Sequence, residues 1–566
     1  MCGIHAVFSA TPHEISPELD NCLRNRGPDY QRQVKRCIIR DDDVRLSLTL
    51  TSTVLALRGD HVAPQPLVDD AAVATGSVLC WNGEAWRIGG DIVDAHDNDG
   101  EAIFARLSKA SALLSLPSST DVLLEVFRAI EGPFAFVYYH EPSNTLLYGR
   151  DRLGRRSLML SHEEETGTVT LCSLSGRQEG GAATGSKWVE VEADGIYSLK
   201  LGSSTFEPER HDWIVGDDAA DFVSSIGKFN KALPASASVL TASSPSVAAL
   251  KEHLLESLRL RVLDIPKPPS ADAEGKTRVA VLFSGGLDCT VLARLCHDIL
   301  DPSAAIDLLN VAFENPRVVA QLKKDAKGDI SDFYEACPDR LTGRKSFAEL
   351  QHVCPGRAFR FVAVNVPYTE AQAHRQQVIS LIHPHNTEMD LSIGYALYFA
   401  ARGQGWSADA SNFNSPPAAY TTPARVLLSG LGADELFGGY SRHPSAFERQ
   451  GYAGLVDELL LDVGRLGKRN LGRDDRVMSH WSKEVRFPFL DERLVRWAIA
   501  TPAWEKCDFD NSEEATSVEA GKRVLRLVAL ELGMEGVAKE KKRAIQFGAR
   551  TAKMESGRVK GTTLVS

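Results

Sequence analysis

The sequence predicts a doubly wound α/β domain in the C-terminal two thirds of the chain, preceded by a strand-rich N-terminal third. Short apolar runs typical of strands buried in a parallel sheet span residues 279–283, 306–313, 359–366 and 425–429. Segments with apolar residues at helical spacing follow at 290–300, 369–382 and 388–401. Because strands and helices alternate, we expect a parallel sheet whose ligands bind at the carboxyl ends of its strands.

The chain divides into two domains and a connection. Strands of the N-terminal third are predicted at 4–8, 53–58, 78–81, 132–139 and from residue 146. We place the N-terminal domain at 1–205 and the C-terminal domain at 246–566, which begins with an amphipathic helix at 247–262. Residues 206–245, rich in Ser, Ala and Asp, are predicted to connect them.

Composition limits the functional classes. The chain has 566 residues, 43% hydrophobic and 25% charged, which is typical of a globular protein with several domains. A net charge of −11 argues against an extended nucleic-acid surface. The ten cysteines form no CxxC pair, so neither a zinc cluster nor a disulfide framework is expected. With no signal peptide and no apolar run long enough for a bilayer, we expect a soluble, cytoplasmic protein without a membrane partner.

The stretch Ser284-Gly-Gly-Leu-Asp288 follows the first predicted parallel strand and precedes a helix. Glycines allow the backbone to approach a ligand closely, and a helix N-terminus attracts anions. The loop lacks the Gly-Lys-Ser/Thr of a Walker P-loop. It resembles the pyrophosphate loop of the ATP pyrophosphatases, and this implies that Asp288 lies beside the phosphates and holds Mg²⁺. The alternative is a plain glycine turn between a strand and a helix.

Cys2 is a candidate nucleophile. Removal of Met1 would leave Cys2 with a free α-amino group, whose pKa near about 8 suits a base for the adjacent thiol. The strand predicted at 4–8 would fix this end of the chain in a sheet. The alternative is an ordinary second residue.

The segment Arg24-Asn-Arg-Gly-Pro-Asp29 adds a second N-terminal motif. With Cys2, it resembles the class II glutamine amidotransferases, although that family usually has histidine at the position of Asn25. The resemblance implies an α+β N-terminal nucleophile fold, with two antiparallel sheets packed face to face and flanked by helices.

The same resemblance implies a glutamine site. Cys2 would be the nucleophile, while the Asn82 side chain and the Gly83 N–H would stabilise the oxyanion. The glutamine-binding residues would be Arg58, Asn82, Gly83, Glu84 and Asp99. Taken alone, Asn82-Gly83 is also compatible with a hairpin turn, Arg58 with a solvated strand end and Asp99 with a polar turn.

A longer motif follows the last predicted parallel strand. Ser429-Gly-Leu-Gly-Ala-Asp-Glu-Leu-Phe-Gly-Gly-Tyr440 resembles the asparagine synthetase signature over nearly its whole length, and Glu484-Val-Arg-Phe-Pro-Phe-Leu-Asp491 resembles another motif of that family. The resemblance implies ATP-binding residues Leu282, Ser284, Gly285, Gly286, Asp288, Cys289, Val311, Ser429, Gly430 and Lys542. It implies that Asp288 and Asp434 hold Mg²⁺.

The two resemblances together imply a glutamine-dependent asparagine synthetase. In that family glutamine is hydrolysed at the terminal cysteine and ammonia crosses an internal channel. ATP converts a carboxylate, aspartate or a related acid, into an acyl-adenylate that ammonia attacks. The resemblance covers most of the chain, except the connection and an insertion near 316–355.

Three departures point to the divergent branch of asparagine synthetase domain-containing proteins. Leu431 replaces a glutamate of the signature and can neither accept a proton nor contact an amine. Cys289 replaces a serine, and a thiol is a weaker hydrogen-bond donor. The C-terminal lysine of the family corresponds to Lys541 or Lys542, beside Arg543, at an unusual distance from the following aromatic residue; a solvated basic run is the alternative.

Three functions follow from these observations. The first is a working glutamine-dependent ligase. The second is a catalytically impaired protein that binds nucleotide or serves as a scaffold. The third is an ATP pyrophosphatase that acts on tRNA or another acceptor, which the acidic net charge and the amidotransferase motifs disfavour.

Overall fold

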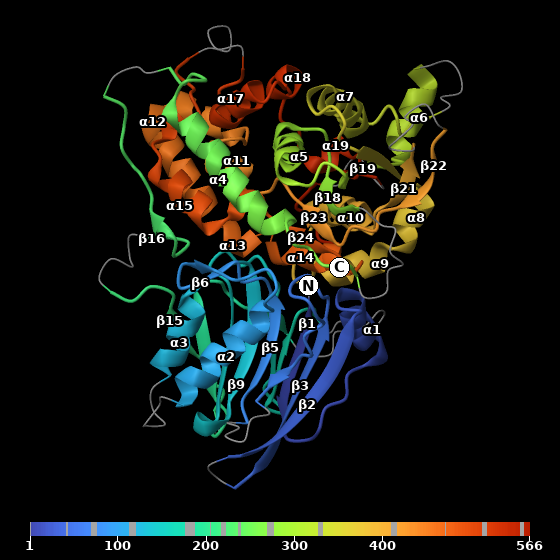
Figure 1. Cartoon of the computed structure of the whole chain (residues 1–566). Coiled ribbons are helices and arrows are strands. Elements are labelled where there is room, and N and C mark those ends of the chain that lie inside the picture. Colours follow the sequence, from blue (N-terminus) through green and yellow to red (C-terminus); the bar gives the residue numbers. More distant parts are fainter. Residues whose placement is uncertain are drawn as a thin grey trace.

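The computed structural model describes residues 2–40, 43–69, 76–112, 120–175, 187–203, 205–216, 222–235, 239–268, 277–325, 332–408, 416–469, 471–511, 518–554 and 560–565. The N-terminal domain lies below the C-terminal domain in Figure 1, and the N-terminal end of the chain lies at the boundary between them. Within the described ranges, no helix combines the length and the apolar character that crossing a membrane requires.

The N-terminal domain contains two six-stranded antiparallel sheets. The first has the order β13 (Trp188–Glu190), β11 (Met159–Glu163), β12 (Thr168–Cys172), β1 (Gly3–Ser9), β3 (Arg45–Val54) and β2 (Tyr30–Ile39). The second has the order β15 (Glu209–Asp212), β14 (Gly195–Lys200), β10 (Thr145–Arg150), β9 (Phe134–His140), β5 (Val78–Gly83) and β4 (Leu67–Val68). Apolar side chains that alternate along both sheets form a shared core, including Ile4, Leu50, Cys80 and Val137.

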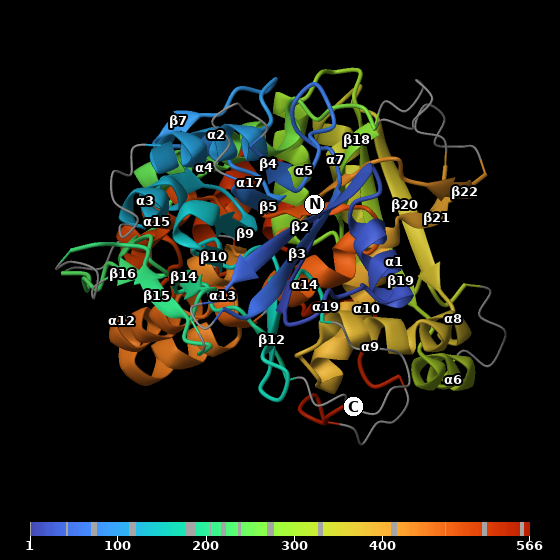
Figure 2. The same cartoon turned by 90° about the horizontal axis from the view of Figure 1, so that it is seen from below.

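Helices flank this pair of sheets. α2 (Asp99–Ala112) and α3 (Asp121–Arg128) pack on the second sheet through a core that contains Trp81, Ile103 and Phe127. α1 (Pro17–Arg26) packs on β1 and β3. Short elements complete the domain: β6 (Arg87–Ile88), β7 (Asp91–Ile92), β8 (Ile130–Glu131) and the 3₁₀ turn η1 (Glu141–Ser143). Figure 2 shows the two sheets from below. The predicted architecture of two packed sheets with helices is confirmed.

The predicted strand at 53–58 is wrong in extent, because β3 ends at Val54. The chain leaves the sheet at this point because it forms hydrogen bonds with the segment that contains Asp29. The carbonyl of Val54 accepts from Asp29 N at 2.9 Å, and the carboxylate of Asp29 accepts from Ala56 N at 2.8 Å. Arg58 therefore lies in a loop beyond the strand.

The connecting segment contains the short hairpin β16 (Phe222–Val223) and β17 (Gly227–Lys228), and α4 (Pro245–Val262) follows it. α4 is close to the helix that the sequence predicts at 247–262. The proposed domain limits, 1–205, 206–245 and 246–566, remain predictions.

The C-terminal sheet has seven strands in the order β22 (Ala418–Thr421), β21 (Gln404–Ser407), β20 (Phe359–Val366), β19 (Ala305–Phe313), β18 (Thr277–Leu282), β23 (Val426–Leu428) and β24 (Glu484–Arg486). β20, β19, β18, β23 and β24 run parallel, as predicted, while β21 and β22 add an antiparallel edge. The strand order reverses beside β18. Such a reversal is where open α/β sheets bind ligands, at the carboxyl ends of the strands.

Helices lie on both sides of this sheet (Figure 1). α5 (Leu287–Ile299) and α7 (Pro338–Val353) lie on one side, and α9 (Arg375–Ile382), α10 (Glu388–Arg402) and α14 (Leu471–Ser479) on the other. The remaining elements are α6 (Pro316–Asp325), α8 (Tyr368–Ala373), α11 (Ala433–Phe437), α12 (Arg442–Val463), α13 (Leu466–Arg469), η3 (Pro488–Leu490), α15 (Glu492–Ala500), η4 (Ala503–Glu505), α17 (Arg523–Glu531), α18 (Glu535–Ala538) and α19 (Ile545–Gly548).

Buried ion pairs join the two domains. Arg26 of α1 contacts the Asp475 carboxylate of α14 at 2.9 Å, and both side chains are fully buried. Arg156 lies 3.6 Å from Asp475 and 3.3 Å from Glu484. Because a buried charge without its partner is strongly unfavourable, these pairs fix how the domains lie against each other.

We expect Asp475→Ala to lower the free energy of unfolding by about 3–5 kcal/mol, because it leaves the buried Arg26 guanidinium without its carboxylate and removes one of the two carboxylates near Arg156. Urea denaturation measures this change. Lys468→Met is the control. It removes an exposed interdomain pair with Glu192 at 3.8 Å, worth less than about 1 kcal/mol. Equal effects of the two substitutions would contradict the prediction.

Candidate functional site

Cys2 lies at the start of β1, between the two sheets of the N-terminal domain. Its backbone N–H donates to Asn82 Oδ1 at 2.9 Å, and its carbonyl accepts from Arg26 Nε at 3.3 Å. Gln65 Nε2 lies 3.9 Å from the Sγ atom. Burial raises the pKa of the Cys2 thiol, and the backbone N–H of Leu55 opposes that shift in part. The thiol therefore needs a nearby base to become a nucleophile.

Asn82 and Gly83 end β5 and carry donors near this thiol. Asn82 is fully buried, and its Nδ2 has no hydrogen-bond partner among the described residues. Glu84 N donates to Pro133 O at 2.9 Å, so the alternation of an antiparallel ladder directs the Gly83 N–H away from β9. Trp81 is two residues before Gly83, so its N–H also points away from β9, and it donates to the Gln65 side chain at 2.9 Å. The strand end thus offers two N–H donors on the side of Cys2, and the hairpin turn that Asn82-Gly83 also suggested is not formed.

Gly83 has a backbone that requires glycine. Its φ is +155°, and a Cβ atom there would lie 2.2 Å from the carbonyl oxygen of Pro133. A larger residue would push β5 away from the segment before β9 and displace the donors described above.

Three charged residues lie close together beside the end of β5. Asp99 begins α2, is buried, and accepts from Ala85 N at 2.7 Å and from Trp81 Nε1 at 3.1 Å. Burial raises the pKa of Asp99, although the Arg58 guanidinium opposes the shift. Arg58 lies 3.8 Å from Glu84 and donates to the Val93 carbonyl. A cation and a buried acid near one thiol suit an amino acid with its own carboxylate and ammonium group.

Glu84 connects the residues around Cys2 to the C-terminal domain. Its carboxylate accepts from Arg486 of β24 at 3.1 Å. Burial and the neighbouring carboxylate of Glu484 raise the pKa of Glu84, while Arg486 opposes them. No sequence motif indicates this contact, because the two residues are 402 positions apart.

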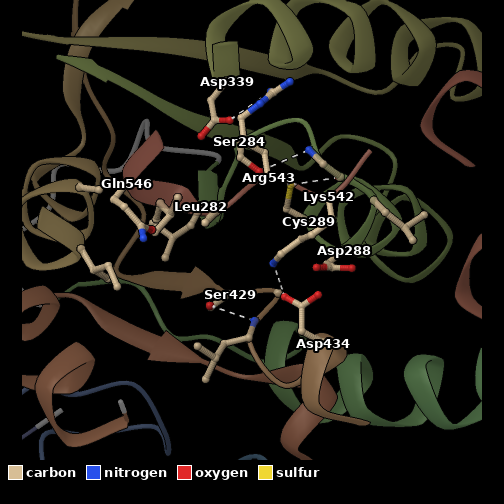
Figure 3. A pocket seen from close by; sticks show the side chains of 18 of the residues that line it. Leu282, Ser284, Asp288, Cys289, Asp339, Ser429, Asp434, Lys542, Arg543 and Gln546 are labelled. Atoms are coloured by element: carbon tan, nitrogen blue, oxygen red, sulfur yellow. Dashed lines mark hydrogen bonds and ion pairs between the residues drawn. The ribbon is translucent and has the colours of Figure 1, made fainter. Parts of the chain in front are cut away.

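A cavity of about 630 Å³ lies at the carboxyl ends of β18 and β23. Nine of the ten predicted ATP-binding residues line it: Leu282, Ser284, Gly286, Asp288, Cys289, Val311, Ser429, Gly430 and Lys542. Leu282 and Gln546 lie on one side of the pocket, and Asp288 and Asp434 on the other (Figure 3). A side with a leucine and an amide and a side with charged groups suit a nucleotide, whose base has a flat face and hydrogen-bonding edges and whose phosphates are charged.

Gly285, the tenth, does not line the cavity; it contacts α7. Its φ is +82°, and a Cβ atom would lie 2.4 Å from the backbone nitrogen of Gly343. Ser346 Oγ donates to the Gly285 carbonyl at 2.6 Å. α7 therefore supports the Ser-Gly-Gly loop directly. The sequence comparison had placed this helix in an insertion, and no local motif indicated its role.

The two predicted metal ligands face one ammonium group. Lys522 Nζ lies 2.7 and 2.9 Å from the two carboxylate oxygens of Asp288, and 2.9 Å from Asp434 Oδ1. Lys542 forms a second ion pair, with Asp434 Oδ2. Burial alone would raise the pKa of Asp434, but the two ammonium groups outweigh burial and hold that pKa well below its usual range. Lys522 was missed by the sequence analysis, because it lies in no recognisable motif.

The three departures from the signature also lie in this cavity. The Cys289 thiol donates to the Gly286 carbonyl at 3.3 Å, so its hydrogen turns toward the loop itself. Leu431 is partly buried against the core, and its backbone N–H donates to Ser429 Oγ at 3.3 Å. Where the signature has an acid, this chain thus presents an apolar side chain.

Asp339, at the start of α7, is a further acid in the cavity. Burial raises its pKa to about 7, although the cations of Arg543 and Lys542 oppose the shift. The Arg543 guanidinium lies 3.8 Å from this carboxylate. Lys541 also lines the cavity, so the whole basic run of 541–543 faces the pocket and is not only a solvated surface.

Fold and site define a class of two-domain proteins that pair glutamine amidotransfer with an asparagine synthase domain. The model of the glutamine amidotransferase domain matches residues 1–176, and that of asparagine synthase matches 418–457 and 447–562. The chain belongs to the asparagine synthase family. The resemblance found in the sequence is confirmed at this level.

Three relatives illustrate the relationship. Asparagine synthetase domain-containing protein 1 of Homo sapiens is 33% identical, covering 98% of this chain and 96% of that protein. An asparagine synthetase domain-containing protein of Saccharomyces cerevisiae is 32% identical, over 95% of this chain and 89% of its own length. A probable glutamine-hydrolysing asparagine synthetase of Dictyostelium discoideum is 21% identical, over 91% and 78%.

We expect Gly285→Ala to weaken ATP binding by about tenfold or more, because the new Cβ overlaps the α7 backbone and the positive φ strains any other residue. Gly356→Ala is the matched control. Its φ is also positive, at +83°, no atom of the described residues lies within 4 Å of a new Cβ, and it does not line the cavity. Isothermal titration with ATP compares the two variants. Similar losses in both would contradict the role given to α7.

Asp339 should make stability depend on pH. Its pKa of about 7 in the folded protein exceeds the unfolded value of about 3.9, so the folded state binds the extra proton. Stability from this group is complete below about pH 4 and is lost as the pH rises through about 7. We therefore expect Asp339→Asn to become progressively more stable relative to wild type over that range.

Melting temperatures of wild type and Asp339→Asn, measured between pH 4 and 8, test this expectation. Asp91→Asn on the exposed strand β7 controls for the loss of one carboxylate. A difference between wild type and Asp339→Asn that stays constant with pH would show the prediction to be wrong.

Proposed function

We propose that the protein is a glutamine-dependent carbon–nitrogen ligase of the asparagine synthase type. Residues 1–205 would release ammonia from glutamine, and residues 246–566 would use ATP to activate a carboxylate. One observation supports this above all: a buried thiol lies beside the Asn82 amide nitrogen, which has no partner among the described residues, and the same chain contains a pocket where two carboxylates face two lysines. Amide hydrolysis uses the first arrangement and ATP cleavage the second.

In the glutaminase half, the Cys2 sulfur attacks the side-chain carbonyl carbon of glutamine. Asn82 Nδ2 and the Gly83 N–H donate to the oxygen that becomes negative. The α-amino group that Cys2 gains on removal of Met1 accepts the thiol proton and delivers it to the departing nitrogen, so ammonia leaves. Water then hydrolyses the thioester, which yields glutamate and regenerates the thiol.

Charged neighbours orient the glutamine. Arg58 pairs with its α-carboxylate and Asp99 with its α-ammonium group, while Glu84 borders the site and is held by Arg486. The buried position of Asp99 makes an unpaired negative charge unfavourable there, and a bound ammonium group would relieve this.

In the synthetase half, an acceptor carboxylate attacks the α-phosphorus of ATP, forming an acyl-adenylate and releasing pyrophosphate. The backbone N–H groups of the Ser-Gly-Gly loop, with Lys522 and Lys542, balance the charge that develops on the phosphates. Ammonia then attacks the acyl carbon, which gives an amide and AMP.

Mg²⁺ fits the residues present. Asp288 and Asp434 supply carboxylate oxygens on one side of the cavity, and Mg²⁺ is commonly held by one or two carboxylates together with substrate phosphates. When bound, the metal would neutralise phosphate charge during pyrophosphate release. The backbone of Gly439 leaves room for this arrangement, because a Cβ atom there would lie 2.0 Å from Asp434 Oδ1.

Aspartate or a related carboxylate is the proposed acceptor. Leu431 makes the wall apolar where the signature has a glutamate, so this wall would not bind an ammonium group of the acceptor. An acid that keeps its carboxylate toward the phosphates but lacks an amine on that side fits as well as aspartate does.

Two side chains favour a second candidate function, a nucleotide-binding protein that forms no amide. Leu431 cannot act as a base, and the Cys289 thiol is turned to the Gly286 carbonyl. A protein with these features could bind nucleotide, hydrolyse glutamine and form no amide. The two candidates separate in one assay, because only the ligase releases pyrophosphate in proportion to an added acceptor.

We expect Cys2→Ala to lower glutamine-dependent pyrophosphate release by at least about 100-fold, because the nucleophile is lost. Release driven by ammonium salts should persist, since the nucleotide cavity is unchanged. Purified protein is assayed with ATP, Mg²⁺, glutamine or ammonium, and a panel of carboxylates. Cys37→Ala, an exposed cysteine on β2, is the matched control.

Retention of glutamine-driven release in Cys2→Ala would refute the glutaminase assignment. Failure of wild type to release pyrophosphate with every carboxylate, under either nitrogen source, would refute the ligase and leave the nucleotide-binding candidate.

A further inference from the structure

Lys522 occupies the space between the two carboxylates assigned to the metal. Its Nζ lies 2.7 and 2.9 Å from both oxygens of Asp288 and 2.9 Å from Asp434 Oδ1. Its side chain is 3% exposed. One ammonium group thus contacts three carboxylate oxygens in a buried setting, which is the position a bridging cation would take.

The backbone fixes Lys522 in this place. It precedes α17 in the left-handed region, with φ +54°, and its backbone N–H donates to the Phe437 carbonyl at 2.9 Å. Gly439 packs against its side chain, because a Cβ there would lie 2.9 Å from the Lys522 Cε atom. Lys522 is therefore held on both its backbone and its side chain.

Lys542 differs from Lys522 in its exposure and in the carboxylates that it contacts. Its side chain is 34% exposed, it belongs to the basic run 541–543, and it pairs only with the outer oxygen Oδ2 of Asp434 among the carboxylates described. It does not lie between Asp288 and Asp434. The two lysines therefore form a natural comparison, one that bridges the pair of acids and one that lies beside it.

A divalent ion and the Lys522 ammonium group compete for the same oxygens. Mg²⁺ needs oxygen ligands at about 2.0–2.1 Å, and two cations at such close range repel each other strongly in a buried site. The nucleotide changes this balance, because its phosphates offer the ammonium group other oxygens while they coordinate the metal.

We propose that Lys522 is an internal counter-ion that keeps Asp288 and Asp434 together and excludes a free divalent metal, so that the metal enters only with the nucleotide. This rests on the proposed function, in that the cavity takes a metal–nucleotide complex. Metal binding is thereby regulated. The site does not bind a metal ion alone, and Asp288 and Asp434 both remain paired with Lys522 until the phosphates bind.

Mn²⁺ serves as the probe, measured by electron paramagnetic resonance on the full chain without nucleotide. We expect Lys522→Met to bind Mn²⁺ at least tenfold more tightly than wild type. Lys542→Met should change Mn²⁺ affinity less than threefold, because Lys522 still bridges the acids. With ATP present, wild type should bind Mn²⁺ at least tenfold more tightly than without it.

Equal Mn²⁺ affinity of wild type and Lys522→Met without nucleotide would overturn the proposal. Circular dichroism shows whether Lys522→Met folds. If it does not, Mn²⁺ binding to the wild-type protein without nucleotide decides. Tight binding that Asp288→Asn abolishes overturns the proposal, and a lack of tight binding supports it. In folded Lys522→Met, the added Asp288→Asn substitution should remove the new site.

The result is distinguishable from failure of the proposed function. Gain of a Mn²⁺ site in Lys522→Met supports the proposal even if no carboxylate yields pyrophosphate with wild type. Pyrophosphate release together with tight nucleotide-free metal binding in wild type would support the ligase and overturn the counter-ion.

Discussion

The requirement that buried charges be paired governs how this molecule is assembled. The Arg26 guanidinium donates to the carbonyl of Cys2 and also pairs with Asp475 of α14, and both side chains are fully buried. One cation therefore connects the backbone of Cys2 in the N-terminal domain to a helix of the C-terminal domain. Separating the domains would leave this buried cation without its carboxylate. The ion pair therefore fixes the distance between Cys2 and the cavity of the C-terminal domain.

α14 carries this constraint to the nucleotide cavity. All of its residues are buried, and Asp475 and Arg476 pair with residues of the N-terminal domain, while Arg473 and Asp474 line the cavity. Buried ion pairs give little net stability compared with apolar packing, so their physical contribution here is geometric. α14 thus links the cavity to Arg26, which holds the backbone of Cys2, and this link is consistent with the proposed passage of ammonia between the two sites.

Sequence reasoning succeeded where the chemistry is local. The glycine loops after β18 and β23 and the strands beside them each consist of consecutive residues, so their limits were predicted nearly correctly. It failed where a contact joins distant segments. Lys522 and the α7 residue Gly343 complete the nucleotide site from positions without a motif, and the end of β3 depends on Asp29. Nothing in a linear pattern encodes which distant side chain supplies a partner.

The nucleotide cavity retains charges that a purely structural role does not require. Asp288, Asp434 and Lys522 together are costly to bury, and apolar residues of similar volume would commonly pack there at no loss of stability. Leu431 shows that this chain does accept an apolar residue where the signature has an acid. An apolar wall beside a charged cluster therefore supports the proposal of phosphate chemistry with a changed acceptor. In that proposal the cluster would contact the nucleotide, and Leu431 would contact the acceptor carboxylate.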